Sequence, residues 1–294
     1  MFVIFGATGN TGGVLASQLL AKGKKVRAVG RSRDKLGALQ KAGAEIAVAD
    51  LENTEAVAEA LKGADAAYLL IPPNMIADDF RGYQKRVVEA VGRAVEGSSL
   101  KHVVLLSSMG AEHASGTGPI VGLYEFEQRL KRIAKLNVLA IRAGYFMPNL
   151  LANIGLMKGQ GINGSPAPGS VPFTLIHPSD IGAYAAQRLE RLDFTGHSAI
   201  NLIGPKLVSM DEATAALGKA VGKTFPYVQF PLEAAEAGMV QAGLKPQMAA
   251  LYAEMYKGAM EGKLGPEAGT SMANGTTSIE TFAEREFAPA FRAS

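Results

Sequence analysis

The first half of the chain alternates short apolar runs with longer stretches of helical period. The apolar runs are continuous rather than alternating, which is typical of strands covered on both faces of a parallel sheet. Asp34 and either Asn53 or Thr54 occupy the positions of helix N-caps. The pattern predicts strands over residues 2–5, 25–29, 45–49, 66–71, 102–106 and 138–141, and helices over residues 12–22, 34–41, 54–61, 79–95 and 123–135. Strands alternating with helices in this way predict a parallel sheet with right-handed crossovers.

The pattern changes after residue 147. Residues 155–172 are rich in Gly, Pro and Asn and predict an irregular loop or a small hairpin, and residues 263–276 show no regular pattern. Helices are expected over residues 177–189, 209–222, 232–262 and 277–287, and strands over residues 197–204 and 225–230. The fold class is therefore α/β: a Rossmann-type doubly wound parallel sheet with a small mixed C-terminal lobe. We expect a first domain over residues 1–150 and a smaller covering lobe over residues 151–294, with residues 177–204 returning to the sheet.

Composition narrows the class of protein. The chain has 294 residues, 48% of them hydrophobic, which is enough for one large domain or a domain with a lobe. A net charge of +3 without a clustered basic stretch argues against a nucleic-acid partner. The absence of cysteine excludes disulfides and thiolate catalysis and fits a cytoplasmic setting, and the four scattered histidines predict no metal site. Apolar residues begin at position 2, leaving no room for a signal peptide, and no run approaches the roughly 18 residues of a membrane helix, so we expect no membrane partner.

Three glycines end the first predicted strand, in the stretch "MFVIFGATGNTGG". Gly6 permits a tight turn, Gly9 lets a phosphate approach the backbone, and Gly12 lets the following helix pack on the strand. The free N–H groups of that helix N-terminus would face the phosphate. An ordinary tight turn is the alternative, but a strand before, a helix after and a second strand about 20 residues on favour a dinucleotide pyrophosphate site. Side chains between the glycines can add donors: Thr8, Asn10 and Thr11.

Three motifs together resemble one known family. The segments "GATGNTGG", "AGYFMPNLL" and "HPSDIGAYAA" are similar to those of the NmrA-like branch of atypical short-chain dehydrogenases/reductases. The resemblance runs over most of the chain and implies a nicotinamide dinucleotide as cofactor. The branch includes NADPH-dependent quinone and triphenylmethane dye reductases, and also redox-sensing regulators with little or no catalysis.

The end of the second strand indicates which nicotinamide cofactor binds. An NAD-preferring site usually has an Asp or Glu there, whereas this strand runs into Gly30 and Arg31. A guanidinium suits a 2′-phosphate, so we expect NADP(H), with Arg31 as the main phosphate ligand and Ser32 or Arg33 assisting. The alternative is that these arginines are simply solvated. The first carboxylate, Asp34, is interpreted as a helix cap.

Further cofactor contacts are expected where the later strands end, because ligands of open α/β sheets bind at the carboxyl ends of strands. In the resembling family an acidic and an apolar residue after the third strand bracket the adenine, which implies Asp50 and Leu51 here. Asp50 could instead cap the next helix. Residues after the fourth, fifth and sixth strands would flank the ribose and the nicotinamide: Leu70, Ile71, Pro72, Ser107, Ser108, Tyr145 and Phe146.

Catalytic side chains are harder to assign. The wider superfamily uses a Tyr-x-x-x-Lys pair, in which both side chains share one helix face. None of the eight tyrosines is followed four positions later by lysine. Tyr124 is on the appropriate helix, but Gln128 stands where the lysine should be. His113, in the loop after the fifth strand, is the other candidate proton donor, although a lone loop histidine is more often solvated.

Two functions remain open. The first is an NADPH-dependent reductase that transfers hydride to a small aromatic electrophile, most simply a quinone, with water as the proton source. Such acceptors are electrophilic enough that positioning supplies most of the rate. The second is a non-catalytic regulator that senses NADP(H). The methionine and tyrosine run over residues 248–260 is interpreted as lobe core or as the face of a homodimer.

Overall fold

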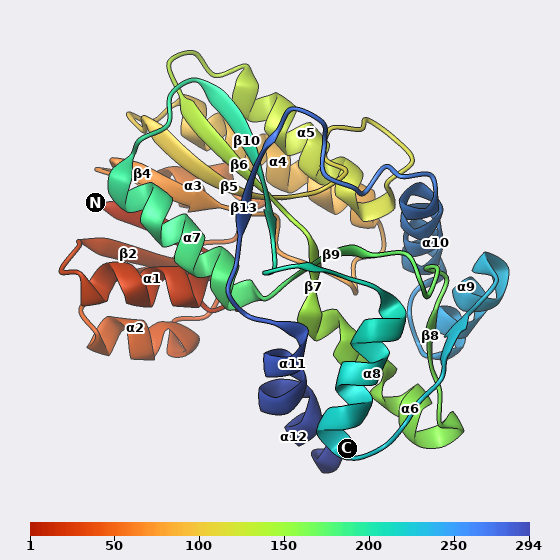
Figure 1. Cartoon of the computed structure of the whole chain (residues 1–294). Helices are drawn as coiled ribbons and strands as arrows, with labels where there is room; N and C mark the ends of the chain where they lie inside the picture. The colour runs from red at the N-terminus through yellow and green to blue at the C-terminus, as the bar shows by residue number, and fades with distance from the viewer.

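Eight parallel strands form the central sheet of the computed structural model, which describes residues 1–294 (Figure 1). The spatial order is β3-β2-β1-β4-β5-β6-β10-β13, so the direction of winding reverses between β1 and β4. The expected Rossmann-type sheet is confirmed. The strands are β1 (Phe2–Phe5), β2 (Val26–Gly30), β3 (Glu45–Val48), β4 (Ala66–Leu69), β5 (His102–Ser108), β6 (Asn137–Ala143), β10 (His197–Ile203) and β13 (Ser271–Asn274).

Helices cover both faces of this sheet, which explains why its strands are apolar without alternation. Val3 on β1 packs in a core with helices of one face, and its neighbour Ile4 packs in a core with helices of the other. One face carries α1 (Gly12–Ala21), α2 (Gly37–Lys41) and α7 (Pro178–Arg191). The other face carries α3 (Thr54–Leu61), α4 (Phe80–Glu96) and α5 (Val121–Lys131).

The lobe lies beside one end of the sheet (Figure 1). Its two small sheets join segments that are distant in sequence, in the orders β11-β9-β7 and β12-β8. The strands are β7 (Tyr145–Phe146), β8 (Asn163–Ser165), β9 (Phe173–Ile176), β11 (Leu207–Val208) and β12 (Tyr227–Gln229). The helices are α6 (Ile154–Gln160), α8 (Met210–Val221), α9 (Leu232–Gln241), α10 (Pro246–Met260), α11 (Ile279–Phe282) and α12 (Ala288–Ala293).

Three sequence expectations are corrected. Residues 155–172 are not an irregular loop, because they contain most of α6 and all of β8, which pairs in parallel with β12. Residues 263–276 contain β13, the edge strand of the main sheet, which pairs in parallel with β10. Asp34 makes no capping hydrogen bond; it is the first residue of a short 3₁₀ turn. Asn53 does cap a helix, since its side chain accepts from the Ala56 N–H at 2.9 Å.

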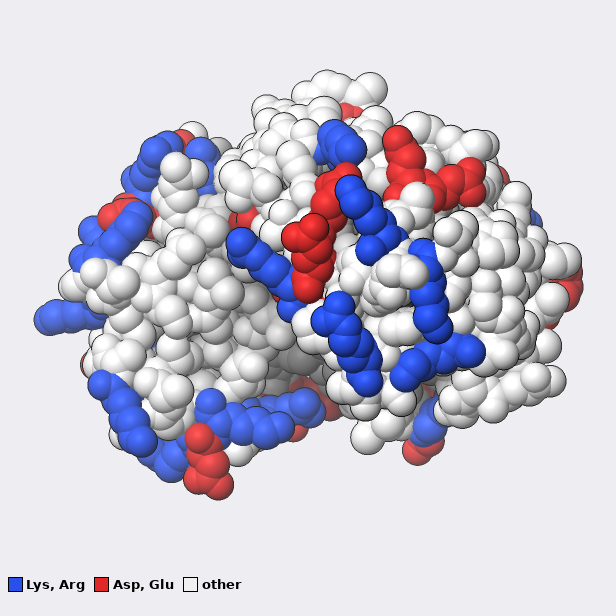
Figure 2. Space-filling view, turned by 60° about the horizontal axis from the view of Figure 1, so that its bottom comes forward, with Lys and Arg blue, Asp and Glu red and all other residues white.

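The surface carries charge of both signs. On the face shown in Figure 2, acidic and basic side chains are interspersed, and a hollow separates the two halves of the molecule. None of the helices combines the length and the apolar character that a membrane crossing requires.

Candidate functional site

One large cavity of about 2180 Å³ lies between the carboxyl ends of the sheet strands and the lobe. The residues expected to bind the cofactor come together along it, although they derive from the ends of six strands. Those that line it are Gly6, Thr8, Gly9, Asn10, Thr11, Arg31, Asp50, Leu51, Leu70, Ile71, Pro72, Ser107, Ser108, Tyr145 and Phe146. Gly12, Ser32 and Arg33 are not among the lining residues.

The glycine turn between β1 and α1 has the geometry of a phosphate cradle. Gly6 has a φ of +64°, a left-handed conformation that favours glycine. A Cβ on Gly12 would lie 2.5 Å from the Gly6 carbonyl oxygen, so only glycine lets α1 approach β1 this closely. Gly12 therefore acts from behind the cavity wall, while Gly9 lies on it.

Thr11, the residue before α1, is held by a buried tyrosine. The Tyr68 hydroxyl on β4 donates to Thr11 Oγ1 at 2.9 Å. Burial raises the pKa of Tyr68 above its ordinary value, and the hydrogen bond to Thr11 only partly offsets this. Tyr68 thus remains a neutral donor at physiological pH, and the Thr11 hydroxyl proton stays available to a ligand at the helix N-terminus.

The far end of the cavity from the lobe carries its charged side chains. Arg31 is exposed there and forms no ion pair with any carboxylate. The Asp50 carboxylate accepts from the Glu52 N–H at 3.0 Å, and α3 is capped by Asn53 instead. Asp50 is therefore a lining residue and does not cap the helix.

A buried ionic cluster lies behind the middle of the cavity wall. The Ser107 hydroxyl donates to Glu127 Oε1 at 2.6 Å, and Arg142 donates to both oxygens of Glu127 at 3.1 and 2.8 Å. Arg142 also contacts Glu267 at 2.5 Å and Glu112 at 3.3 Å. Burial disfavours the charged guanidinium, but the hydrogen bond and the charges of these glutamates raise the pKa of Arg142 overall. Because its hydroxyl is engaged by Glu127, Ser107 does not offer its proton to a substrate.

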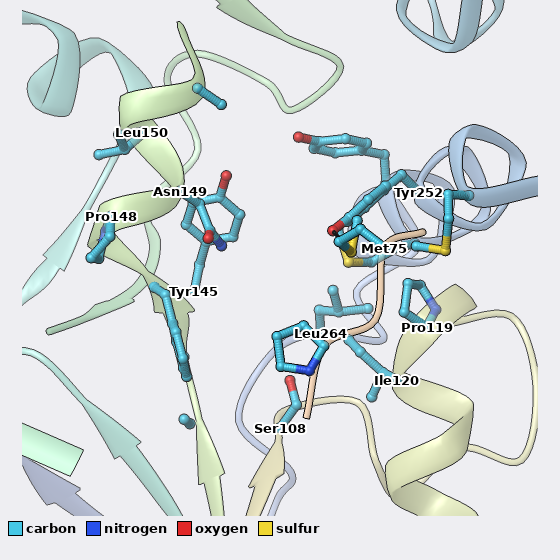
Figure 3. A pocket seen from close by; sticks show the side chains of 18 of the residues that line it. Met75, Ser108, Pro119, Ile120, Tyr145, Pro148, Asn149, Leu150, Tyr252 and Leu264 are labelled. Atoms are coloured by element: carbon cyan, nitrogen blue, oxygen red, sulfur yellow. Dashed lines mark hydrogen bonds between the residues drawn. The ribbon is translucent and has the colours of Figure 1, made fainter. Parts of the chain in front are cut away.

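The end of the cavity under the lobe is an aromatic pocket (Figure 3). Tyr145 and Asn149 lie on one wall, and Tyr252 of α10 and Met75 face them from the other. Burial raises the pKa of Tyr256, one helical turn after Tyr252, to about 12. Burial also raises the pKa of Tyr145 well above its ordinary value, and nearby Tyr256 adds to this through its hydroxyl.

The α10 residues were not predicted as site residues. The sequence pattern favours lobe core or a dimer face for residues 248–260, whereas the structure places Met248, Tyr252, Met255 and Tyr256 along the cavity. The sequence does show aromatic and methionine residues at helical spacing in this segment. It does not show that this face of the helix lies against the cavity.

The two candidate proton donors lie outside the cavity lining. Tyr124 on α5 borders a separate shallow depression together with Gln128 and Arg132. His113 is partly exposed and lies 3.8 Å from Glu112, behind the cavity wall. Neither position brings a proton donor to the aromatic pocket.

Comparisons with known proteins identify the family. The NmrA-like family model matches residues 1–283, and the chain therefore belongs to the NmrA-like family. An NAD(P)H azoreductase of Xenophilus azovorans is 27% identical over 258 residues, which are 87% of this chain and 86% of that protein. A (4-alkanoyl-5-oxo-2,5-dihydrofuran-3-yl)methyl phosphate reductase of Streptomyces griseus is 25% identical over 82% of this chain and 80% of its own length. The crystal structure of an NADPH-dependent quinone oxidoreductase from Escherichia coli, complexed with NADPH, shares the fold with a TM-score of 0.80 at 22% identity, over 98% of this chain and 100% of that one.

Proposed function

We propose that the protein is an NADPH-dependent reductase that transfers a hydride to a small aromatic electrophile, a quinone. The observation that carries the proposal is the continuous cavity, which joins the glycine turn at α1 to the aromatic pocket under the lobe. A ligand that spans this distance places its two ends in chemically different surroundings, as a dinucleotide requires. Family membership and the two reductase relatives support the same class of reaction.

The lining residues fit NADP(H). The N-terminus of α1 and the Gly9 backbone would hold the pyrophosphate, because a helix N-terminus presents free N–H groups and a partial positive charge. The unpaired Arg31 guanidinium would hold the 2′-phosphate, and Ser108 and Tyr145 would border the nicotinamide. When bound, the cofactor supplies a hydride.

The protein's own contribution at the acceptor end is positioning and hydrogen bonding. The hydroxyls of Tyr145 and Tyr256 would donate hydrogen bonds to an acceptor oxygen. Their raised pKa values keep both tyrosines protonated at neutral pH, so they act as donors, while water delivers the proton. An electrophilic acceptor held next to the cofactor then needs no Tyr-x-x-x-Lys pair.

The test is the oxidation of NADPH by the purified protein in the presence of benzoquinones and naphthoquinones, with NADH in parallel. Turnover with NADPH that exceeds turnover with NADH is the expected result. If calorimetry shows that NADPH binds but no quinone is reduced, the quinone is excluded as acceptor and the weight moves to a non-catalytic NADP(H) sensor. That second function is the alternative that the missing Tyr-x-x-x-Lys pair leaves open.

A further inference from the structure

The acceptor half of the cavity has no charged side chain on its wall. Arg31, Asp50 and Glu52 are the charged residues that line the cavity, and all three lie at the end remote from the lobe. The lining that continues past α6, α9 and α10 consists of uncharged residues. An anionic acceptor would lose its hydration there without gaining a counter-charge, which is unfavourable.

The cluster behind the wall adds to this preference. Three carboxylates, those of Glu112, Glu127 and Glu267, surround the single guanidinium of Arg142. Negative charge therefore exceeds positive charge among these four side chains, and burial limits the screening of Glu127 and Glu112, whereas Glu267 is 43% exposed and also has Lys131 nearby. An anion placed beside Ser107 would be repelled as well as dehydrated.

Beyond the aromatic pocket the cavity continues as an apolar groove between α6 and α9, which we call the α6–α9 groove. Gly155, Leu156 and Gly159 of α6 and Gly238 and Met239 of α9 line it. The three glycines are exposed, and a Cβ built on any of them would meet no atom within 4 Å, so both helices border open space at these positions. Helix α9 has no buried residue, and its Ala234, Ala235 and Met239 line this space.

The size of the cavity also indicates room for an apolar substituent on the acceptor. Its volume of about 2180 Å³ exceeds the roughly 300–1,000 Å³ typical of a pocket for one small ligand. Space thus remains beyond a dinucleotide and a single quinone ring, and this space is the groove. Small and apolar residues form most of its walls, and the polar residues Gln160 and Gln241 lie at the last positions of α6 and α9, so a flexible hydrocarbon chain fits the groove better than a charged group.

We infer that the acceptor is uncharged and carries an extended apolar substituent, an alkyl or isoprenyl chain, that lies in the α6–α9 groove. The inference rests on the proposed reductase function, and it names the class of quinone that the site selects. The ring would lie between Tyr145 and Tyr252, with the chain directed towards Gly159 and Gly238.

Two quinones with the same ring test the chain. One is 2,3-dimethoxy-5-methyl-1,4-benzoquinone, and the other is its 6-decyl derivative. We expect kcat/KM to be at least about tenfold higher for the decyl compound, because each methylene group buried in the groove favours binding. Calorimetry with NADP⁺ present should show the same preference in Kd, a readout that does not depend on turnover.

Filling the groove should remove the preference. Gly159→Leu and Gly238→Leu place a side chain in the open space, and leucine is a better helix former than glycine, so both variants should fold. Each should lower the decyl-to-chainless ratio of kcat/KM at least about fivefold, because the leucine displaces buried methylene groups. Gly37→Leu on α2 is the matched control, since Gly37 also has no atom within 4 Å of a Cβ and lies outside the cavity lining. It should keep the wild-type ratio.

A charged probe tests the other half of the inference. 1,4-Naphthoquinone-2-sulfonate should have a kcat/KM at least about tenfold below that of 1,4-naphthoquinone, although the sulfonate makes the ring more electrophilic. Equal kcat/KM for the chain-bearing and chainless quinones, or a preference for the sulfonate, overturns the inference but leaves the reductase function standing. Binding of NADPH without reduction of any quinone overturns the proposed quinone reductase function itself.

Discussion

The two ends of the cavity are built in opposite ways. The phosphate end is local: Gly6, Gly9 and Gly12 lie within one turn between β1 and α1, and Arg31 follows the adjacent strand. The acceptor end combines residues that are far apart in sequence, such as Met75, Tyr145 and Tyr252. The first end is charged and the second is uncharged. The difference teaches that cofactor binding in this fold is a property of one motif, whereas acceptor binding is a property of how the lobe packs.

The largest effect of a single substitution is expected at the buried ionic cluster, which lies between the phosphate end and the acceptor end of the cavity. Arg142→Met leaves the Glu127 carboxylate buried without a counter-charge, with only the Ser107 hydroxyl still donating to it, and we expect a loss of about 3–5 kcal/mol in the free energy of unfolding. Urea denaturation followed by circular dichroism measures it. The double variant Arg142→Met, Glu127→Gln should recover part of the loss because the unpaired buried charge is removed. A loss below about 1 kcal/mol for the single variant would mean that water reaches the carboxylates.

A larger side chain at Gly12 should disrupt the phosphate end of the cavity. In Gly12→Val the new Cβ would lie 2.5 Å from the Gly6 carbonyl oxygen, so the turn must move away from its present shape. We expect NADPH affinity to fall at least about 100-fold, equivalent to about 2.7 kcal/mol. Calorimetry measures the affinity, and circular dichroism checks that the sheet is intact. Gly37→Ala, on a helix with open space around it, should bind NADPH as the wild type does. Retained affinity in Gly12→Val would remove the turn from cofactor binding.

Arg31→Ala sharpens the comparison, because it should affect one feature of the phosphate end alone. Loss of a charged hydrogen bond to the 2′-phosphate should weaken NADPH binding about tenfold to 30-fold and leave NADH binding almost unchanged. Arg33→Ala is the matched control, since Arg33 is also exposed but does not line the cavity. An unchanged ratio of NADPH to NADH affinity in Arg31→Ala would exclude Arg31 as the selecting residue.

The smallest expected effect concerns the acceptor end at high pH. Burial raises the pKa of Tyr256 from 10.0 to about 12, so the folded state keeps a proton that the unfolded state releases. The resulting stability is present below pH 10 and is lost as the pH rises towards 12, which amounts to about 1.4 kcal/mol at pH 11. Urea denaturation at pH 8 and pH 11 should show a smaller decrease for Tyr256→Phe than for the wild type. Equal decreases would place the Tyr256 hydroxyl in water.

The sequence predicted the elements that depend on local patterns. Continuous apolar strands and the glycine turn were recognisable because burial on both faces and close packing at Gly12 restrict the residue types at each position. The strand β13 was not predicted, because it is only four residues long and most of its side chains are exposed, with Met272 52% exposed. Such an edge strand is defined by its pairing with β10 and not by its own composition.

The site residues also fall into a group that the sequence predicts and a group that it does not. The residues that line the phosphate end follow strand ends, where topology makes their position predictable. The contact of Ser107 with Glu127 and the orientation of Tyr256 depend on side-chain packing between segments that no local pattern connects. The same limit applies to the proton donor candidates, because Tyr124 and Gln128 lie on a face of α5 that turns away from the cavity.

The pairing of β10 with β13 has a consequence for how this protein can diversify. The two strands are neighbours in the sheet, yet residues 204–270, including α9 and α10, lie between them in the chain. The helical pair thus belongs to one crossover connection, which leaves the carboxyl end of β10 and returns to the amino end of its parallel neighbour β13. Such a segment can be lengthened, exchanged or transplanted as a cassette while the glycine turn stays untouched. New acceptor preferences could then be acquired by replacing the α9–α10 wall of the acceptor end, a single continuous stretch of chain, while the cofactor site stays unchanged.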